Sequence, residues 1–319
     1  MENQCIRQSA IPHATRLFTD FLYQFECVRP FYSFEPFDDQ SFFRAARALT
    51  YPEATRASVT AVLEEQSALF GATDQTRRNI ERLRRGAVAV VTGQQVGLFT
   101  GPMFAFYKAL TAIRLADLLS ERGLECVPVF WLATEDHDLE EVNHAFLLEA
   151  GYRSHRIADG PAPHVHGAPV GEVKLGPNVS RHSQQAAALL PPTEWTAELA
   201  AMLHDTYRPG ETYGQSFARL MNRLLGRFGV VMLDPMHLQL RRLAAGLFRR
   251  ALESADELGA MLLERNRELV KAGYHAQVHV TENSTLLFRR WEGQRIALDR
   301  KSTRLNSSHS RASRMPSSA

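Results

Sequence analysis

Residues 88–108 read VAVVTGQQVGLFTGPMFAFYK, and this stretch decides how the 319-residue chain folds. The apolar run from Ala87 to Val91 is rich in β-branched residues, which is typical of a strand buried on both faces. From Met103 to Leu119, apolar residues recur at helical spacing. The loop between them offers flexible backbone and side-chain amides, supplied by Gly93, Gly97, Gly101, Gln94 and Gln95. The stretch therefore predicts a strand, a loop that a ligand can approach, and a helix.

A second apolar run, Cys126 to Ala133, follows the expected helix end at Gly123. The pattern predicts a β-α-β unit with a right-handed crossover and two parallel strands. The sequence TEDHD, residues 134–138, comes directly after the second strand. The glycine-rich loop and this charged cluster should both lie beyond the carboxyl ends of neighbouring strands, which is where open α/β sheets bind ligands.

The loop does not match a known phosphate-binding fingerprint. Its spacing is neither GxGxxG nor GxxxxGK[ST], so an anion site at the helix N-terminus and an ordinary strand-to-helix turn remain about equally weighted. His137 and His144 are not spaced as in HExxH, which disfavours zinc. No metal is predicted, although carboxylates leave a magnesium ion open.

Composition narrows the class of protein. At about 150 residues per domain, the length suggests about two domains, and 45% hydrophobic residues suffice for a core. A net charge of +2 argues against nucleic acid or an anionic membrane as principal partner. Three widely spaced cysteines, Cys5, Cys27 and Cys126, form no disulfide or zinc pattern. The chain also shows no signal peptide and no apolar stretch of about 20 residues, so we expect a cytoplasmic protein.

The remaining sequence predicts five segments. They are an N-terminal helical and aromatic segment packing on the core (1–86), the first half of a Rossmann-like core (87–149), an inserted loop and hairpin module (150–192), the second half of the core (193–300) and a non-native tail (301–319). The second half contains expected helices at 193–204 and 212–227, a long helical pattern at 237–271 that is either continuous or interrupted, a strand at 229–233, and hairpin strands at 275–280, 285–290 and 294–298. Asp234, at the end of a strand, either reaches the pocket or caps the next helix. The Ser/Arg-rich tail is expected to be disordered and dispensable.

The two motifs together resemble a known enzyme family. Residues 92–95 (TGQQ) with Gly97, Gly101 and Lys108, followed by residues 130–131 (FW) and 135–138 (EDHD), are similar to BshC, the cysteine-adding enzymes of bacillithiol biosynthesis. Further matches are residues 212–213 (TY) with Phe217, residues 229–235 (GVVMLDP), and residues 273–275 (GYH) with Gln277. The resemblance covers roughly residues 10 to 300 of the chain.

The resemblance implies a fold and an activity. The fold is α/β, a Rossmann-like parallel sheet with helices on both faces, an inserted connecting module and a C-terminal β-hairpin region. The implied reaction is a ligation that joins L-cysteine to glucosaminyl-malate through an amide bond. Family members continue into a long helical arm and are expected to form homodimers, so the chain is expected to be truncated. The alternatives are a non-catalytic small-molecule-binding domain or an inactive fragment of the ligase.

Amide formation requires proton transfer and stabilisation of developing charge. His137, flanked by Asp136 and Asp138, is the candidate for proton transfer, and Glu135 completes the predicted catalytic set. The predicted substrate-binding residues are Thr92, Gly93, Gln94, Gln95, Gly97, Gly101, Lys108, Trp131, Asn143 and Asp234. No recognised ATP motif is present, which leaves the cofactor, ATP included, open.

Overall fold

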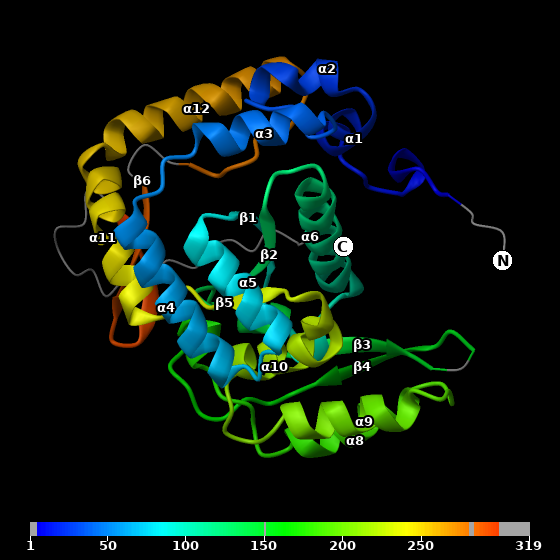
Figure 1. Ribbon diagram of the computed structural model, residues 1–319. Helices are drawn as coiled ribbons and strands as arrows, with labels where there is room; N and C mark the ends of the chain where they lie inside the picture. The colour runs from blue at the N-terminus through cyan, green and yellow to red at the C-terminus, as the bar shows by residue number, and fades with distance from the viewer. Residues whose placement is uncertain (1–4, 150, 281–283, 300–319) are drawn as a thin grey trace. The chain divides into compact units, whose positions relative to one another are not determined.

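The computed structural model describes residues 5–149, 151–280 and 284–299 (Figure 1). These residues fall into two compact units. Unit 1 contains residues up to Leu49, 246–289 and those from Ala297 onward, and unit 2 contains residues 50–245 and 290–296. The expectation of a disordered tail at 301–319 lies outside the described residues. The five predicted segment boundaries remain a prediction.

Unit 2 is organised around a three-stranded parallel sheet. Its strands are β1 (Val88–Gln94), β2 (Cys126–Leu132) and β5 (Val231–Leu233), in the order β1-β2-β5. Val88 pairs with Cys126, and Val129 pairs with Val231, both in parallel register. The crossover from β1 to β2 is the helix α6 (Met103–Glu121). The prediction of three parallel strands in one sheet is confirmed.

The central strand β2 sends alternate side chains into two separate cores. Val127 and Val129 pack with residues of α4 (Glu53–Leu69) and α5 (Asp74–Arg85). Phe130 and Leu132 pack on the other face, against α6 and α10 (Tyr213–Leu225). Because side chains alternate along a strand, a continuous apolar run needs cover on both faces. The Rossmann-like arrangement with helices on both faces is therefore confirmed.

Side chains on α5 fix the chain where it enters the third strand. Thr73 caps the helix by accepting a hydrogen bond from the Thr76 N–H, and its hydroxyl donates to the Gly226 carbonyl at 2.7 Å. The Asn79 amide donates to the Gly229 carbonyl at 2.7 Å. Gly229 has a φ of +72°, which favours glycine. These contacts hold the turn before β5, and so help to place β5 against the rest of the sheet.

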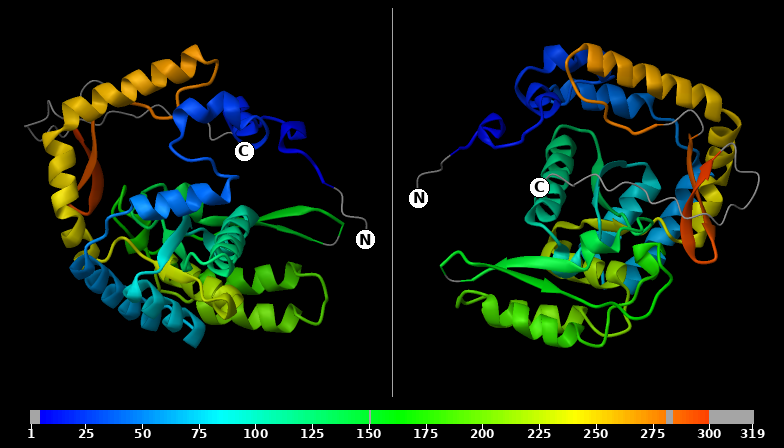
Figure 2. Two further views of the ribbon diagram at one scale, coloured as in Figure 1. Left: turned by 45° about the horizontal axis from the view of Figure 1, so that its top comes forward. Right: turned by 180° about the vertical axis from the view of Figure 1, so that it is seen from behind.

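The segment between β2 and α10 differs in part from its prediction. A short helix, α7 (Leu139–Val142), precedes an antiparallel hairpin of β3 (His144–Leu148) and β4 (Ser154–Ala158). The hairpin thus begins before residue 150. Residues expected as loop form α8 (Val179–Leu189), whose buried side chains recur at helical spacing, but two of them are the polar His182 and Ser183. Because these two buried residues are polar, the apolar residues of this segment do not recur at helical spacing, and the sequence pattern does not indicate the helix. Figure 2 shows α8 beside α9 (Thr196–Thr206) and near the β3-β4 hairpin.

Unit 1 contains three N-terminal helices, the second half of the next-to-last helix and all of the last helix. The helices are α1 (Arg16–Tyr23), α2 (Phe25–Val28), α3 (Asp39–Ala48), α11 (Leu238–Glu253), which begins in unit 2, and α12 (Ala255–Lys271). Their core joins Phe25 and Val28 to Leu269 and Tyr274. The long helical pattern predicted from residue 237 to 271 is interrupted at Ser254, between α11 and α12.

Short 3-10 turns lie in both units. Those of unit 1 are Gln8–Ala10 and Arg29–Phe31, and those of unit 2 are Leu98–Thr100, Val170–Glu172 and Gly226–Phe228.

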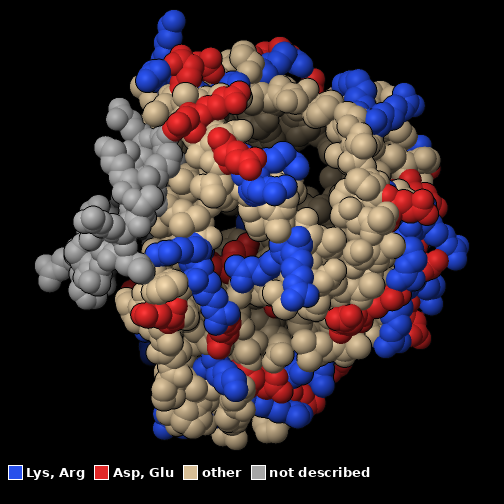
Figure 3. All heavy atoms as spheres, turned by 90° about the vertical axis from the view of Figure 1, so that its left-hand side faces the viewer, with Lys and Arg blue, Asp and Glu red and all other residues tan. Residues whose placement is uncertain are grey.

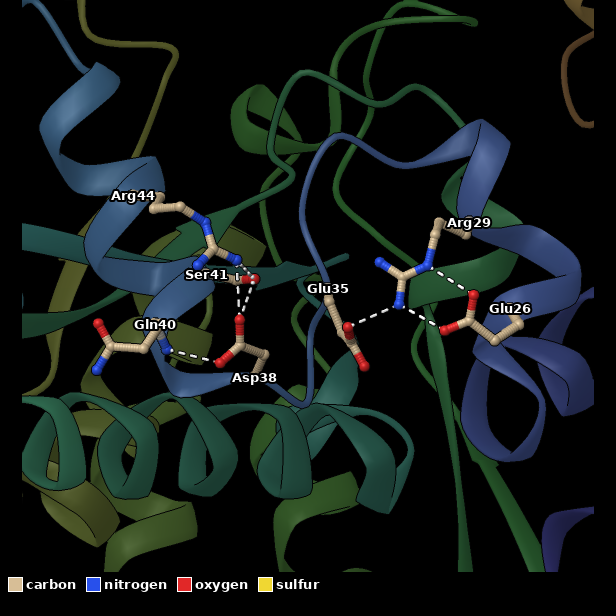
Figure 4. Close-up of polar contacts among 7 residues, drawn as sticks. All are labelled: Glu26, Arg29, Glu35, Asp38, Gln40, Ser41 and Arg44. Atoms are coloured by element: carbon tan, nitrogen blue, oxygen red, sulfur yellow. Dashed lines mark hydrogen bonds and ion pairs between the residues drawn. The ribbon is translucent and has the colours of Figure 1, made fainter.

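Two small ionic groups order the N-terminal helices (Figure 4). Arg29 pairs with both Glu26 and Glu35, at 2.6 and 2.9 Å. Asp38 accepts hydrogen bonds from the Gln40 N–H and from Arg44, and so caps the start of α3. The Arg44 guanidinium beside Asp38 is the main cause that lowers the pKa of this carboxyl. These charged pairs are mostly exposed, so each adds little stability.

The C-terminal hairpin consists of β6 (Ser284–Trp291) and β7 (Gln294–Asp299). These two strands confirm the predicted β-hairpin region. The third predicted strand, residues 275–280, is wrong. That segment follows the end of α12 without pairing to a strand among the described residues, and the Asn266 amide donates to its Val278 carbonyl at 2.8 Å. A helix side chain thus takes the place of a strand partner there.

The surface carries both signs of charge. On the face drawn in Figure 3, acidic and basic side chains are interspersed and form no single continuous field. Within the described part of the chain, no helix has the length and apolar character that a membrane span requires.

Candidate functional site

A cleft lies at the carboxyl ends of β1 and β2. It has a volume of about 470 Å³. One wall comes from the end of β1 and the other from β2 and the segment after it, with the lining residues Val91, Thr92, Gly93, Gln94, Gln95, Trp131, Ala133 and Asp136. The structure therefore brings the TGQQ and EDHD segments together at one edge of the sheet. That edge is where an open parallel sheet binds its ligands.

The predicted loop begins later than expected, because β1 continues through Gln94. The Ala133 N–H donates to the Gln94 carbonyl at 3.0 Å and so extends the pairing past the end of β2. Gly93 lies directly opposite Trp131 in this pairing. A Cβ on Gly93 would lie 2.7 Å from the Trp131 carbonyl oxygen and 2.9 Å from its Cβ. The glycine thus permits the two strands to approach closely at the cleft. It lies within a strand and does not form a turn.

A Gly93→Ala substitution should destabilise this strand pair. The added methyl group meets rigid backbone, so we expect a loss of about 1–3 kcal/mol in the free energy of unfolding. Gly246→Ala is the matched control, because a Cβ there has nothing within 4 Å and Gly246 lies inside a helix. It should be neutral, or stabilising by up to about 1 kcal/mol. Urea titration followed by circular dichroism measures both; equal stability of the two variants would contradict the close approach.

Gly97 and Gly101 form the turn between β1 and α6. A Cβ on Gly97 would lie 2.7 Å from the Gly101 Cα, and Gly101 has a φ of +67°. Phe99 and Thr100, between them, also have positive φ. The two glycines are absent from the cleft lining. In this structure they allow the backbone at residue 97 to pass close to the backbone at residue 101. The N-terminus of α6, for which the sequence leaves an anion site and an ordinary turn both open, likewise contributes no residue to the lining.

The two glutamines connect the cleft to charged side chains on both sides. The Lys108 ammonium, on α6, donates to Gln94 Oε1 at 2.8 Å. Gln95 Nε2 donates to Asp136 Oδ2 at 2.9 Å and also to a Glu141 carboxylate oxygen. Gln94 Nε2 in turn reaches Gln95 Oε1 at 3.5 Å. The amides therefore form a polar chain across the cleft, from a cation to two carboxylates.

The two carboxylates that begin the EDHD segment lie in different environments. Burial raises the pKa of Glu135, and the nearby charge of Asp234 acts in the same direction. Glu135 Oε1 accepts from the Trp131 indole at 3.3 Å, while Oε2 is buried without a hydrogen-bond partner. Burial also tends to raise the pKa of Asp136, but hydrogen bonds from Gln95 and the His137 N–H outweigh it and lower that pKa. Adjacent carboxyls with opposite shifts are suited to different roles in proton transfer.

The other two members of EDHD are more exposed. The His137 side chain is 47% exposed, and its Nδ1 lies 3.5 Å from Asp136 Oδ1. Asp138 caps α7 by accepting from the Glu141 N–H at 3.3 Å. Its carboxylate therefore has a clear structural role, in addition to the catalytic one predicted.

Asn143 and Asp234, both predicted to bind substrate, are absent from the cleft lining. Asn143 ends α7, and its carbonyl accepts from the Asp159 N–H at 2.8 Å. Asp234 Oδ1 accepts from the Thr134 hydroxyl and, at 2.9 Å, from the Met236 N–H. The Gln66 side chain holds the Asp234 backbone. Asp234 thus ties β5 to the residue before Glu135 and forms the turn that precedes α11.

Sequence reasoning missed a contact from the C-terminal hairpin. Arg295, on β7, places its Nη1 3.2 Å from His137 Nδ1. Nothing in the local sequence marks this arginine, because its partner is 158 residues away and the hairpin carries other arginines. Within the described residues, no group of three or more His, Cys, Asp or Glu side chains is arranged to hold a metal ion.

The sheet, its two helical layers and the cleft at the strand ends define a Rossmann-like α/β domain. The chain belongs to the family described as bacillithiol biosynthesis BshC, N-terminal Rossmann-like domain, whose model matches residues 1–315.

Curated relatives carry the name "Putative cysteine ligase BshC". Those of Koribacter versatilis and Solibacter usitatus are each 41% identical, over 93% and 94% of this chain and 55% of each relative. That of Chlorobaculum tepidum is 33% identical over 83% of this chain and 47% of its own length. The chain therefore spans about half the length of the curated relatives it matches.

Proposed function

We propose that this chain carries the substrate cleft of a cytoplasmic cysteine ligase, which joins L-cysteine to glucosaminyl-malate through an amide bond. The observation that carries the proposal is the direct contact between its two motifs, made by Gln95 Nε2 and Asp136 Oδ2 at 2.9 Å. Family membership supports the reaction class, since the relatives are named as cysteine ligases.

The polar chain across the cleft suits substrates with both charged signs. L-cysteine and glucosaminyl-malate each carry an amine and at least one carboxylate. Lys108 can hold a substrate carboxylate, while Asp136 and Glu141 can hold an ammonium group if the Gln95 amide is displaced. Thr92 and Gln94 add neutral donors and acceptors to the same lining. The exposed indole of Trp131 gives the cleft an apolar wall.

The EDHD segment supplies groups for the chemistry. The attacking amine must lose a proton, and Glu135 is suited to accept it because its raised pKa makes it a stronger base than an ordinary carboxylate. His137 is the second group for proton handling. We propose ATP as the co-substrate, which would let the cysteine carboxylate oxygen leave with phosphate. The amine nitrogen would bond to the carboxyl carbon as the carbon–oxygen bond breaks, and the amine proton would go to Glu135.

Mass spectrometry tests the proposed reaction. The chain is incubated with L-cysteine and glucosaminyl-malate, with and without ATP, beside the Koribacter versatilis relative as positive control. We expect a product with the summed mass of both substrates less one water. If the relative forms this product and the chain does not, the ligase proposal fails for this chain. Calorimetric binding of either substrate without product would instead favour a non-catalytic binding domain.

A further inference from the structure

We propose that Arg295 is a positioning residue that holds neutral His137 with its ring proton on Nε2. The relevance of this tautomer to catalysis rests on the proposed ligase function. The guanidinium Nη1 of Arg295 lies 3.2 Å from His137 Nδ1. Both residues belong to unit 2, although the hairpin and the EDHD segment are far apart in sequence.

The direction of this hydrogen bond follows from the chemistry of arginine. A guanidinium has only N–H donors and keeps its charge at all ordinary pH values. His137 Nδ1 must therefore accept the bond through its lone pair. A neutral imidazole whose Nδ1 accepts carries its proton on Nε2. Within the described residues, Nε2 has no protein partner, so its N–H remains available to a ligand.

Asp136 is the competing partner for Nδ1. A carboxylate in contact with Nδ1 would favour a proton there and leave Nε2 as a base, which is the arrangement of a catalytic triad. However, Asp136 Oδ1 is 3.5 Å from Nδ1 and already accepts the His137 backbone N–H at 2.8 Å. Its Oδ2 accepts from Gln95. Each oxygen thus already accepts one hydrogen bond, and at 3.2 Å against 3.5 Å the guanidinium is the nearer partner of the ring.

Backbone contacts hold Arg295 at this position. The Arg295 N–H donates to the Gly167 carbonyl at 2.9 Å. The loop that contains Gly167 also forms hydrogen bonds with the EDHD segment and the residue before it. The Val170 N–H donates to the Asp136 carbonyl at 2.7 Å, and the Gly171 N–H donates to the Thr134 carbonyl at 2.8 Å. Residues 290–296, this loop and the EDHD segment all belong to unit 2 and are linked by these hydrogen bonds.

The proposed tautomer changes the role of His137. With its lone pair engaged by Arg295, the ring presents an N–H and no free acceptor. It can then donate to an oxygen on which negative charge develops, as a neutral imidazole does in other enzymes. The proton of the attacking amine would go to Glu135 instead. Arg295 itself touches neither substrate nor reacting atoms in this scheme.

Histidine tautomers are measured by long-range ¹H–¹⁵N NMR on the chain labelled with ¹⁵N-histidine, at mildly alkaline pH and without substrate. A His137→Gln variant identifies the signals of His137. We expect protonated Nε2 and unprotonated Nδ1 in the unmodified chain. In Arg295→Met, which removes every donor, the proton should move toward Nδ1, because Asp136 remains as its partner. Arg295→Lys retains a charged donor and should restore the original pattern.

Arg290→Met is the matched control. It removes the neighbouring hairpin arginine, which pairs with Glu172. It should leave the tautomer unchanged. The inference is overturned if the unmodified chain carries its proton on Nδ1, if Arg295→Met leaves the pattern unchanged, or if Arg290→Met shifts it equally. The spectra need no turnover, so a chain with the expected tautomer and no ligation product would contradict the ligase function alone.

Discussion

A His137→Ala variant should form the ligation product about 10²- to 10⁴-fold more slowly than the unmodified chain, the usual cost of removing a proton-transfer group. Loss of a donor to a developing oxyanion gives about 10²- to 10³-fold, so either chemical role predicts a large effect. The side chain is about half exposed, so its removal should cost little stability. Initial rates by mass spectrometry, with unfolding curves for the same sample, measure the two effects separately.

His144→Ala is the control for His137. Its imidazole lies near the same segment, but its Nδ1 is 3.3 Å from Asn143 Oδ1 and its ring packs on Phe146. We expect near-normal turnover from this variant.

Gln94→Ala should instead weaken substrate binding, with each lost hydrogen bond worth about 0.5–1.5 kcal/mol. Near-normal turnover by a stable His137→Ala chain would remove His137 from the mechanism.

The sheet could be predicted because its strands are continuous apolar runs separated by an amphipathic helix. The run at Cys126 reports burial on both faces, and burial on both faces implies helical cover. The same expectation for the run at Val88 is wrong, because β1 is an edge strand in which no residue is fully buried and Val91 is 57% exposed. The α8 helix was missed because buried His182 breaks its apolar period. A sequence window shows that a residue is polar, but its buried partner, Asp159, is 23 residues away. The false strand at 275–280 shows the opposite error, since a strand-like pattern does not supply a strand partner.

The site could be predicted only as far as strand ends could be placed. Two motifs that follow neighbouring parallel strands must meet at one edge, which is why Gln95 and Asp136 are found together. Contact of Gly97 and Gly101 with substrate stays a prediction, and the structure shows that their own backbones approach each other closely. Arg295 could not be found in this way, because it reaches the site from a hairpin whose docking depends on tertiary contacts alone.

A buried polar network around Asp159 accounts for the second large effect that we expect. Asp159, directly after β4, is 2% exposed. Its carboxylate accepts from the Gly176 N–H at 3.0 Å and from the Tyr213 hydroxyl at 3.2 Å, and lies 3.2 Å from His182 Nδ1. Burial, together with the charge of Asp159, raises the pKa of Tyr213, so this hydroxyl keeps its proton and donates. One carboxylate thus joins β4, α8 and α10.

Replacing Asp159 by alanine should lower the free energy of unfolding by about 3–5 kcal/mol, because it leaves several buried donors unpaired at once. That is a large part of the roughly 5–15 kcal/mol that holds a domain folded. Tyr213→Phe removes one bond to a charged acceptor and should cost about 1.5–3 kcal/mol. Glu149→Ala removes a half-exposed partner of His155 and should cost at most about 1 kcal/mol. Urea unfolding of the three variants tests this order, and an Asp159→Ala chain as stable as Glu149→Ala would show that the network does not hold these elements together.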